Sequence, residues 1–559
     1  ARLFIDILAE KLGVVSDHIQ TGYEDTWYYL WRERRLPVNV DPLDARLDDE
    51  LDRVRLRRIF NQGLDHEVGY ALPIKRDWPV GLSGPKWVTG PWFFRDERMY
   101  LFPGDSSMGY RLPLDSLPWV SPEQYPFMHE HDTFAAKPDL QDASVLKAQY
   151  GSHQIGAGFA QGGAVSVQGQ AVSGVGASPQ NGEWGGLRAN PMVASAGPAT
   201  SVPIDPLREP SRFESAHWIT RTALCVEVRN PDRANGPKVE SAGDGGGVMY
   251  VFMPPLASLD DYLDLLAAVE ATATDLGMQI VLEGYPPPRD HRLQVLQVTP
   301  DPGVIEVNIH PAKSWGQLVD HTEFLYQAAH ETRLSTEKFM IDGRHTGTGG
   351  GNHFVLGGAT PADSPFLRKP QLLSSLLTFW HNHPSLSYLF SGLFIGPTSQ
   401  APRLDEARTD QVYEVEIGLR ELERQESIWG HCPPWIIDRT LRNLLIASPR
   451  NAHRSDFCID KLYSPDGPTR RLGLLELRAF EMPPHARMSV VQQLLLRALV
   501  ARFWDHSYTA PVTRWGTTLH DRFMLPTFVK MDFDDVLTEL GDAGFHFDPA
   551  WFAPHFEFR

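Results

Sequence analysis

Residues 302–311 read PGVIEVNIHP and residues 347–354 read GTGGGNHF, and these two stretches decide which fold and chemistry we expect. In the first stretch Glu306, Asn308 and His310 alternate with aliphatic residues, as in a strand whose side chains alternate between two faces. A strand face that gathers a carboxylate, an amide and an imidazole is costly to bury unless it binds something. In the second stretch a glycine run brings backbone N–H groups together, which suits a phosphate. The two stretches together predict a site for a metal ion and a nucleotide phosphate.

The composition is that of a globular protein with more than one domain. The chain has 559 residues, of which 42% are hydrophobic and 22% charged, and this length predicts two or three domains. The formal net charge of −18 argues against a nucleic-acid partner. No run of 18 apolar residues occurs, which argues against a membrane span. The cysteines Cys225, Cys432 and Cys458 are widely spaced, so we expect no disulfide framework and a reducing cytoplasm.

Strand and helix signals alternate along the chain and predict an α+β fold with antiparallel strands. We expect an N-terminal accessory region over 1–150, a linker or insertion rich in glycine, alanine and serine over 151–205, and one catalytic domain over 206–559. Because the sequence opens in a helical pattern without methionine, we expect a piece of a longer polypeptide. The expected elements are helices at 44–61, 259–276, 316–334 and 488–504, strand-like segments at 92–94 and 99–102, and strands at 224–228, 248–253, 279–283 and 472–480.

Acidic and imidazole side chains lie on or beside separate predicted strands, at Glu227, Glu306, His353 and Glu476. The cations around the last two are Arg454, Lys461, Arg470, Arg471 and Arg478. Mg²⁺ prefers carboxylate oxygens, and the arginine guanidinium fits phosphate oxygens. Phosphoryl transfer from ATP needs both, because a metal ion bridges the phosphates while fixed cations neutralise the transferring group. These residues therefore predict an ATP site.

The order of these pieces resembles the catalytic domain of glutamine synthetases and related carboxylate–amine ligases. That family has a Gly-Gln-x-Glu strand, a helix, a Phe-Met-x-Lys-Pro stretch, a glycine loop ending in histidine, and a strand with Glu-x-Arg. The corresponding segments are 302–306, 316–334, 339–342, 347–353 and 475–478. The strings VLEGYPPPRD at 281–290, DGRHTG at 342–347 and SYLFSG at 387–392 look like the bacterial amidoligase domain that is associated with transglutaminase-like proteins.

The resemblance implies a glutamine synthetase-like catalytic domain, with a curved, largely antiparallel sheet flanked by helices, and an N-terminal α/β accessory region. It implies an enzyme that uses ATP and Mg²⁺ (or Mn²⁺) to form an amide or isopeptide bond through an acyl phosphate. The substrates would be small-molecule or peptide carboxylates and amines, and a transglutaminase-like domain would be fused to the enzyme or act with it.

The resemblance also implies roles for particular residues. The implied metal ligands are Glu227, Glu306, Glu476 and His353. The implied nucleotide contacts are Gly349, Gly350, Gly351, Asn352, His353 and Lys461. The implied catalytic residues are Arg478, Arg454 and Glu306. Arg403 and Arg408 lie on an expected loop, where they bind a substrate carboxylate or are solvated.

Other positions depart from the family pattern and leave alternatives open. Gln297 or Val298 stands where synthetases carry a second metal-binding glutamate, which leaves Glu283 or His310 as candidate ligands. Each motif also has a structural interpretation. The stretch from Glu306 to His310 would be an edge strand with a solvated polar face, the loop 347–353 a hairpin connection, and Glu476 with Arg478 a surface ion pair. Three other functions stay open, namely an ATP-dependent phosphotransferase of the same fold type, an inactive scaffold for a transglutaminase-like domain, and a metal-dependent hydrolase.

Overall fold

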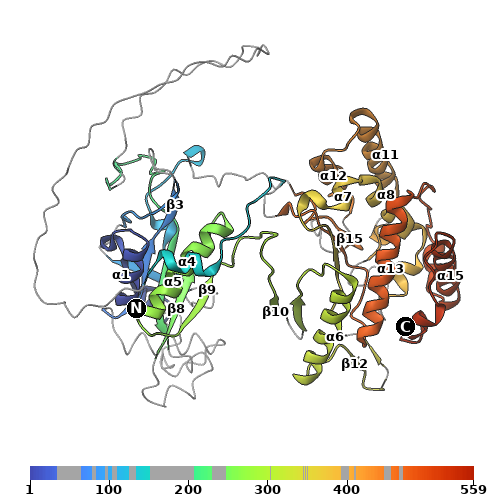
Figure 1. Cartoon of the computed structure of the whole chain (residues 1–559), viewed down its shortest axis with the longest axis horizontal. Coiled ribbons are helices and arrows are strands. Elements are labelled where there is room, and N and C mark those ends of the chain that lie inside the picture. The colour runs from blue at the N-terminus through green and yellow to red at the C-terminus, as the bar shows by residue number, and fades with distance from the viewer. Residues whose placement is uncertain are drawn as a thin grey trace, which may run out of the picture. The chain divides into compact units, whose positions relative to one another are not determined.

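The structure, a computed structural model, contains two compact units, and each is described by itself (Figure 1). Unit 1 comprises Ala1–Phe127 with Gln141–Pro288, and unit 2 comprises Met128–Leu140 with Arg289–Arg559. The described residues are 1–33, 65–77, 84–94, 98–103, 110–124, 134–151, 205, 207–229, 247–301, 304–343, 345–346, 348, 350–391, 402–407, 411–445, 455–464 and 470–558. The expected helix at 44–61, almost all of the expected linker, and Gly349, Arg408 and Arg454 lie outside them.

Unit 1 is built on a seven-stranded mixed sheet in the order β6-β5-β1-β2-β7-β8-β9. Two neighbouring pairs, β1 with β5 and β8 with β9, are parallel, and the other pairs are antiparallel. The strands are β1 (Gln20–Glu24), β2 (Glu67–Pro73), β5 (Met99–Pro103), β6 (Tyr110–Arg111), β7 (Ala223–Arg229), β8 (Val248–Met253) and β9 (Ile280–Gly284), with a separate pair of β3 (Lys75–Asp77) and β4 (Lys86–Val88). The expected strands at 99–102, 224–228, 248–253 and 279–283 are confirmed.

The two faces of this sheet are covered differently. One face packs its aliphatic side chains on α1 (Arg2–Lys11) and α5 (Leu259–Asp275), which Figure 1 shows with β8 and β9. The opposite face packs against irregular chain that includes Trp92, whose indole N–H donates to the Thr220 carbonyl at 2.6 Å. Residues 92–94 are not a strand, so that prediction is wrong, because an aromatic run can fill a core without regular pairing. The other α-helices among the described residues of this unit are α2 (Thr26–Glu33) and α4 (Ala143–Gln149).

The boundary between the units differs from the predicted domain boundary. We expected residues 206–288 to belong to the catalytic domain, but β7, β8 and β9 complete the sheet of unit 1. The reason is the pairing of β7 with β2, in which Tyr70 faces Val226. Such pairing between segments far apart in the sequence leaves no signal in local composition, whereas the composition shift at 151–205 is conspicuous.

Unit 2 is mainly helical and carries several short strands. Its large core is rich in aromatic residues, and the ring of Phe480 contacts those of both Trp380 and Phe390. The long helix α13 packs against α6, α8 and α15 (Figure 1). The helices are α6 (Trp315–Glu331), α7 (Pro365–Arg368), α8 (Pro370–Asn382), α9 (Ser385–Tyr388), α10 (Leu404–Ala407), α11 (Gln411–Trp429), α12 (Pro434–Leu441), α13 (Ala486–Asp505), α14 (Thr518–Phe523), α15 (Pro526–Asp542) and α16 (Ala553–Phe558). Across the described residues, no helix is both long and apolar enough to cross a membrane.

The strands of unit 2 form three small sheets. These are the hairpins β10 (Gln297–Asp301) with β11 (Val304–Asn308) and β12 (Lys338–Phe339) with β13 (His345–Thr346), and a three-stranded sheet in the order β14 (Phe354–Leu356), β16 (Leu475–Leu477), β15 (Phe457–Cys458). The alternation predicted around Glu306 is confirmed in β11: Glu306 pairs with Thr299, and Val307 pairs with Val298 on the opposite face.

Candidate active site around Glu476

Glu476 lies on the central strand of the three-stranded sheet in unit 2. Its neighbours Leu475 and Leu477 are fully buried in the aromatic core. Because successive side chains of a strand point to opposite faces, Glu476 faces away from that core. It pairs with Val355 on β14 and Cys458 on β15, and its side chain is buried. A carboxylate buried at this position needs partners that compensate for its lost hydration.

Cationic and imidazole groups surround the Glu476 carboxylate. Lys461 Nζ lies 2.9 Å from Oε2, and Arg478 Nη1 lies 2.9 Å from Oε1. His353 Nδ1 lies 3.4 Å from Oε1. Backbone bonds fix both cations, because the Arg478 N–H donates to the Asp456 carbonyl at 2.8 Å and the Lys461 carbonyl accepts from two later N–H groups. The structure thus brings together four residues that the sequence analysis named.

The electrostatics of this cluster favour an ionised glutamate and a neutral histidine. Burial opposes the charge of Glu476, but Lys461 first and then Arg478 and His353 lower the pKa of this carboxyl below its usual value. Burial, followed by the charge of Arg478, lowers the pKa of His353, although Glu476 and Glu306 act in the opposite direction. A neutral imidazole carries one proton. With Nδ1 facing the carboxylate, we assign that proton to Nδ1, which leaves Nε2 as an acceptor.

The glycine loop before β14 is held by backbone bonds to the chain that follows β16. The N–H of Asn352 donates to the Phe480 carbonyl at 2.9 Å, and the N–H of Gly350 donates to Thr348 Oγ1 at 3.2 Å. Gly351 forms a bridge with Glu481. This differs from the expectation that the N–H groups of the run cradle a phosphate, because two of them are already bonded within the chain. Among the described residues of this loop, the N–H groups of Gly350 and Asn352 are therefore not free for a phosphate.

Residues that the sequence analysis did not single out hold Asn352 in place. Its amide Nδ2 donates to Ser489 Oγ and Gln492 Oε1 on α13, each at 2.9 Å. Both partners are buried. A signal was present in the sequence, because Gln492 interrupts an apolar helix and a buried amide needs a partner. Asp456, whose carbonyl positions Arg478, gave no such signal.

Glu306 lies within electrostatic reach of this cluster. Its charge acts on the pKa of His353, and its Oε1 accepts from Asn308 Nδ2 at 3.2 Å. Two buried atoms of the cluster, His353 Nε2 and Arg478 Nε, have no hydrogen-bond partner among the residues that the structure describes. Nowhere in the part of the chain that the structure describes do three or more His, Cys, Asp or Glu side chains form a group that could hold a metal ion. The protein groups that could contact a ligand here are thus two carboxylates, the nearby cations, and one imidazole nitrogen without a described partner.

Other candidate residues lie elsewhere in the molecule. Glu227 is on β7 and Glu283 on β9, both in unit 1, and Arg229 Nε donates to the Glu227 carboxylate. In unit 2, Gln297 on β10 faces Asn308, and the His310 ring lies 6.5 Å from that of His321. The metal roles implied for Glu227, Glu283 and His310 stay predictions.

Arg403 differs from its expected setting on a loop open to substrate or solvent. It is 2% exposed, and its guanidinium donates to Asp405, to the carbonyls of Trp380 and His381, and to Ser387. The nearby Asp405 and Asp456 charges offset the burial and raise its pKa. These contacts give Arg403 a structural role inside the helical core of unit 2.

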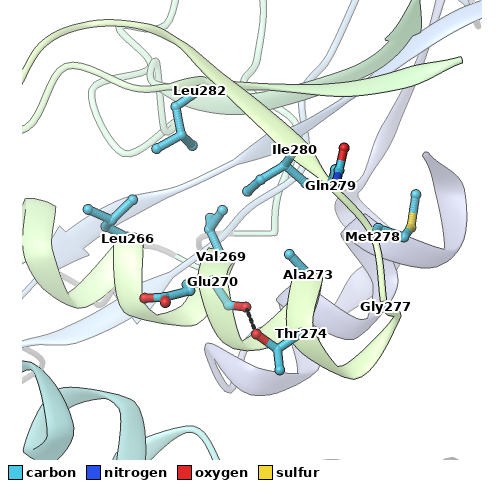
Figure 2. A pocket seen from close by; sticks show the side chains of 10 residues that line it. All are labelled: Leu266, Val269, Glu270, Ala273, Thr274, Gly277, Met278, Gln279, Ile280 and Leu282. Atoms are coloured by element: carbon cyan, nitrogen blue, oxygen red, sulfur yellow. Dashed lines mark hydrogen bonds between the residues drawn. The ribbon is translucent and has the colours of Figure 1, made fainter.

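Unit 1 contains an apolar groove of about 500 Å³ between α5 and β9 (Figure 2). Leu266 and Val269 of the helix and Ile280 and Leu282 of the strand line it, and Thr274 Oγ1 donates to the Glu270 carbonyl at 2.8 Å. Glu270 is the charged residue of this lining. The groove therefore lacks the concentration of cations that distinguishes the Glu476 cluster.

Comparison with known proteins identifies the family. The whole chain, residues 1–559, matches the family described as "Putative amidoligase enzyme (DUF2126)", and the chain belongs to this family. That description is of an enzyme of the ligase type. No curated protein and no solved structure matches the chain.

Proposed function

We propose that this chain is an ATP- and Mg²⁺-dependent ligase that joins a carboxylate to an amine. The observation that carries the proposal is the ionised Glu476 between Lys461 and Arg478, in a chain whose family is described as amidoligase. A substrate carboxylate oxygen attacks the γ-phosphorus of ATP to give an acyl phosphate and ADP. The amine nitrogen then attacks the acyl carbon, phosphate leaves, and the nitrogen loses a proton, so that an amide or isopeptide bond is formed.

The side chains of the cluster suit this reaction. Lys461 and Arg478 bind the transferring phosphate and neutralise its charge through charge-assisted hydrogen bonds. Two buried atoms without hydrogen-bond partners support a bound ligand, because His353 Nε2 offers an acceptor and Arg478 Nε a donor. Arg454, which the family resemblance adds to this set, lies outside the described residues and stays a prediction.

The carboxylates of Glu306 and Glu476 suit a magnesium ion whose other ligands would be phosphate oxygens of the substrate and water. Mg²⁺ is commonly held by one or two carboxylates together with phosphate oxygens and water. Such a site does not need three protein side chains, and we assign Glu306 and Glu476 as the residues that hold the ion. A magnesium ion held by these residues would neutralise phosphate charge.

One observation favours a second function, that of an inactive scaffold for a transglutaminase-like partner. Gln297 or Val298 stands where the family resemblance leads us to expect a second metal-binding glutamate, and Gln297 faces another amide, Asn308, across the β10–β11 hairpin. An amide is a weaker magnesium ligand than a carboxylate because it is uncharged. The scaffold function requires neither ATP binding nor bond formation.

Calorimetric titration with ATP and Mg²⁺ tests the proposal. We expect the wild type to bind ATP in a Mg²⁺-dependent manner and Glu306→Ala to bind at least tenfold more weakly. Glu421→Gln is the matched control, because Glu421 is a surface residue of unit 2 bonded to Arg424. Mg²⁺-dependent ADP release with an amide product would support the ligase, and a stable phosphorylated product would instead indicate a phosphotransferase. A folded wild type that does not bind ATP would overturn the proposal and leave the scaffold function.

A further inference from the structure

The Glu476 carboxylate is engaged on both of its oxygens by the chain's own cations. Lys461 occupies Oε2 and Arg478 occupies Oε1, each at 2.9 Å. In the proposed function these two cations bind phosphate and Glu476 binds the metal ion. Each of the three groups is therefore bonded to a partner that it must exchange when the ligands bind.

We propose that Glu476 acts as an internal substitute for phosphate, so that the anion and the divalent cation bind to this site with strong positive coupling. This inference rests on the proposed function and adds to it an energetic coupling between the two ligands. Either ligand alone binds weakly, and each strengthens the binding of the other by the same factor, as linkage requires.

The charges of the cluster explain the coupling. Glu476, Lys461 and Arg478 together carry a formal charge of +1 with His353 neutral, and Glu306, whose charge also acts on His353, brings the sum to zero. A divalent cation arriving alone would raise the local charge and would find the carboxylate oxygens engaged by cations. An anion arriving alone would compete with a buried carboxylate that is already bonded to the same two cations. When both arrive, the carboxylate turns to the metal ion and the cations turn to the phosphate, so no buried charge is left without a partner.

The side chains of the two cations differ in exposure, although the backbones of both are fixed. The backbone N–H of Arg478 is bonded to the Asp456 carbonyl, and its side chain is 19% exposed. The Lys461 side chain is 34% exposed and flexible beyond its fixed backbone. Lys461 is thus the group that leaves Glu476 most readily, and its removal should open the carboxylate to a metal ion.

The test measures each ligand alone, which avoids the binding of metal to nucleotide in solution. The probes are Mn²⁺ without nucleotide, followed by electron paramagnetic resonance, and ATP without metal in excess chelator, followed by calorimetry. We expect Lys461→Met to bind Mn²⁺ alone at least fivefold more tightly than the wild type. We expect Glu476→Gln to bind metal-free ATP at least fivefold more tightly, although it loses the Mn²⁺ site.

Controls separate partner exchange from a general change of charge. Glu421→Gln removes the same charge from the surface of unit 2 and should leave both affinities within twofold of the wild type. All titrations are made at 0.15 M salt or more, where exposed charges are screened. In the double variant of Lys461→Met and Glu476→Gln, the gain in ATP affinity should disappear, because the gain depends on a freed lysine.

The outcomes distinguish this inference from the proposed function. A wild type that binds neither ligand, even when both are present, contradicts the proposed function. If the wild type binds both ligands together but Lys461→Met binds Mn²⁺ no more tightly than it does, the inference alone is wrong. Should Glu476→Gln fail to fold, the Lys461→Met titration still decides, because the partly exposed Lys461 can be replaced without leaving a cation buried.

Discussion

Two of the described strands carry a glutamate that is followed two residues later by an arginine: Glu227 with Arg229 on β7, and Glu476 on β16 with Arg478 directly after the strand. The two glutamates are about equally buried, at 6% and 5% exposure, and in both motifs the arginine donates to its glutamate. The surroundings differ. Arg229 lies over the rings of Tyr250 and Phe252, at 5.1 and 5.5 Å, whereas Glu476 has a second cation and an imidazole beside it.

This comparison shows that the three-residue motif does not define a site. In unit 1 the aromatic rings beneath Arg229 hold its guanidinium by cation–π contact in a large, mostly apolar sheet. In unit 2 the partners of Glu476 come from three separate segments of the chain. The distinction lies in what distant segments bring to the strand.

The largest effect that we expect is a difference between the two glutamates in the ligase reaction. Glu476→Gln should lower the rate of Mg²⁺-dependent ADP release by about 100-fold or more, the size seen when one electrostatic contact to a transition state is removed. Glu227→Gln should lower it by less than about threefold, because we place the site in unit 2 and a neutral amide keeps the shape of the side chain. Steady-state kinetics with circular dichroism as a folding control measures both.

An equal loss in the two variants would break the comparison. It would mean that Glu227 is a metal ligand, as the family resemblance implies, and that unit 1 contributes to the site. A loss confined to Glu227→Gln would move the site away from Glu476 altogether.

The next effect concerns stability, at a polar centre of unit 1. Asp264 accepts from the Trp87 indole N–H at 2.8 Å and the Tyr150 hydroxyl at 2.6 Å, and it pairs with Arg76 at 3.1 Å. Asp264→Ala leaves these donors without their acceptor, so we expect a loss of about 3 kcal/mol in the free energy of unfolding. Chemical denaturation measures the loss, and hydrogen exchange on β7 and β8 assigns it to unit 1.

A matched variant sharpens this result. Asp534 pairs with Lys530 on the surface of α15, and Asp534→Ala should change the stability by less than about 0.5 kcal/mol. ATP affinity should be unchanged in both variants. A weaker ATP affinity in folded Asp264→Ala would show that unit 1 supports the site.

The sequence was sufficient to predict the elements with regular periodicity. Ser258 caps α5 by accepting from the Asp261 N–H, and the helices predicted at 259–276, 316–334 and 488–504 are present as α5, α6 and α13. Local patterns predict these elements because capping and the spacing of apolar residues act within a few residues. The strand predicted at 472–480 is present only as the short β16, since its ends turn into irregular chain.

The sequence named the residues of the Glu476 cluster, but it did not predict how the chain divides into two units. Glu476, Lys461, Arg478 and His353 were named from the order of motifs, and the structure brings them together. The inclusion of β7 in the sheet of unit 1 and the burial of Arg403 were missed, because both depend on contacts between segments far apart in the sequence. Spacing along the chain carries no information about such contacts.

A smaller effect is expected where α13 holds the glycine loop. Asn352→Ala removes the bonds to Ser489 and Gln492 and loosens the position of the adjacent His353. We expect kcat/KM for ligation to fall by about tenfold, equivalent to about 1.4 kcal/mol. The loss should appear in kcat more than in KM, because the loop positions the reacting groups rather than the whole substrate.

Gln493→Ala is the control for Asn352→Ala. Gln493 Nε2 also donates to Ser489 Oγ, at 3.2 Å, but it does not hold the loop. Its replacement should leave kcat within about twofold of the wild type. If both variants lose activity equally, the effect comes from α13 as a whole and not from the loop, and Asn352 has no positioning role.

The smallest effect that we expect is a pH dependence of stability in unit 2 that unit 1 does not share. In unit 2, burial raises the pKa of Asp456 to about 7, although Arg403 opposes the shift, and burial lowers the pKa of His381 and His555 to about 4. A carboxyl whose folded pKa is raised contributes stability at low pH that is lost as the pH rises to about 7. A histidine whose folded pKa is lowered costs stability as the pH falls below its unfolded value of about 6.5. The two trends oppose each other between about pH 4 and 6.5.

Two variants should separate these opposing trends. Asp456→Asn removes the first trend, so its Tm relative to the wild type should rise between pH 5 and 8, by on the order of 2–4 °C. His555→Gln removes part of the second, so its relative Tm should instead be higher at pH 5 than at pH 8. Scanning calorimetry measures both slopes, and hydrogen exchange on β8 should show neither, because these groups belong to unit 2. Slopes of the same sign would mean that burial does not control these groups, and the same slopes on β8 would mean that the two units unfold together.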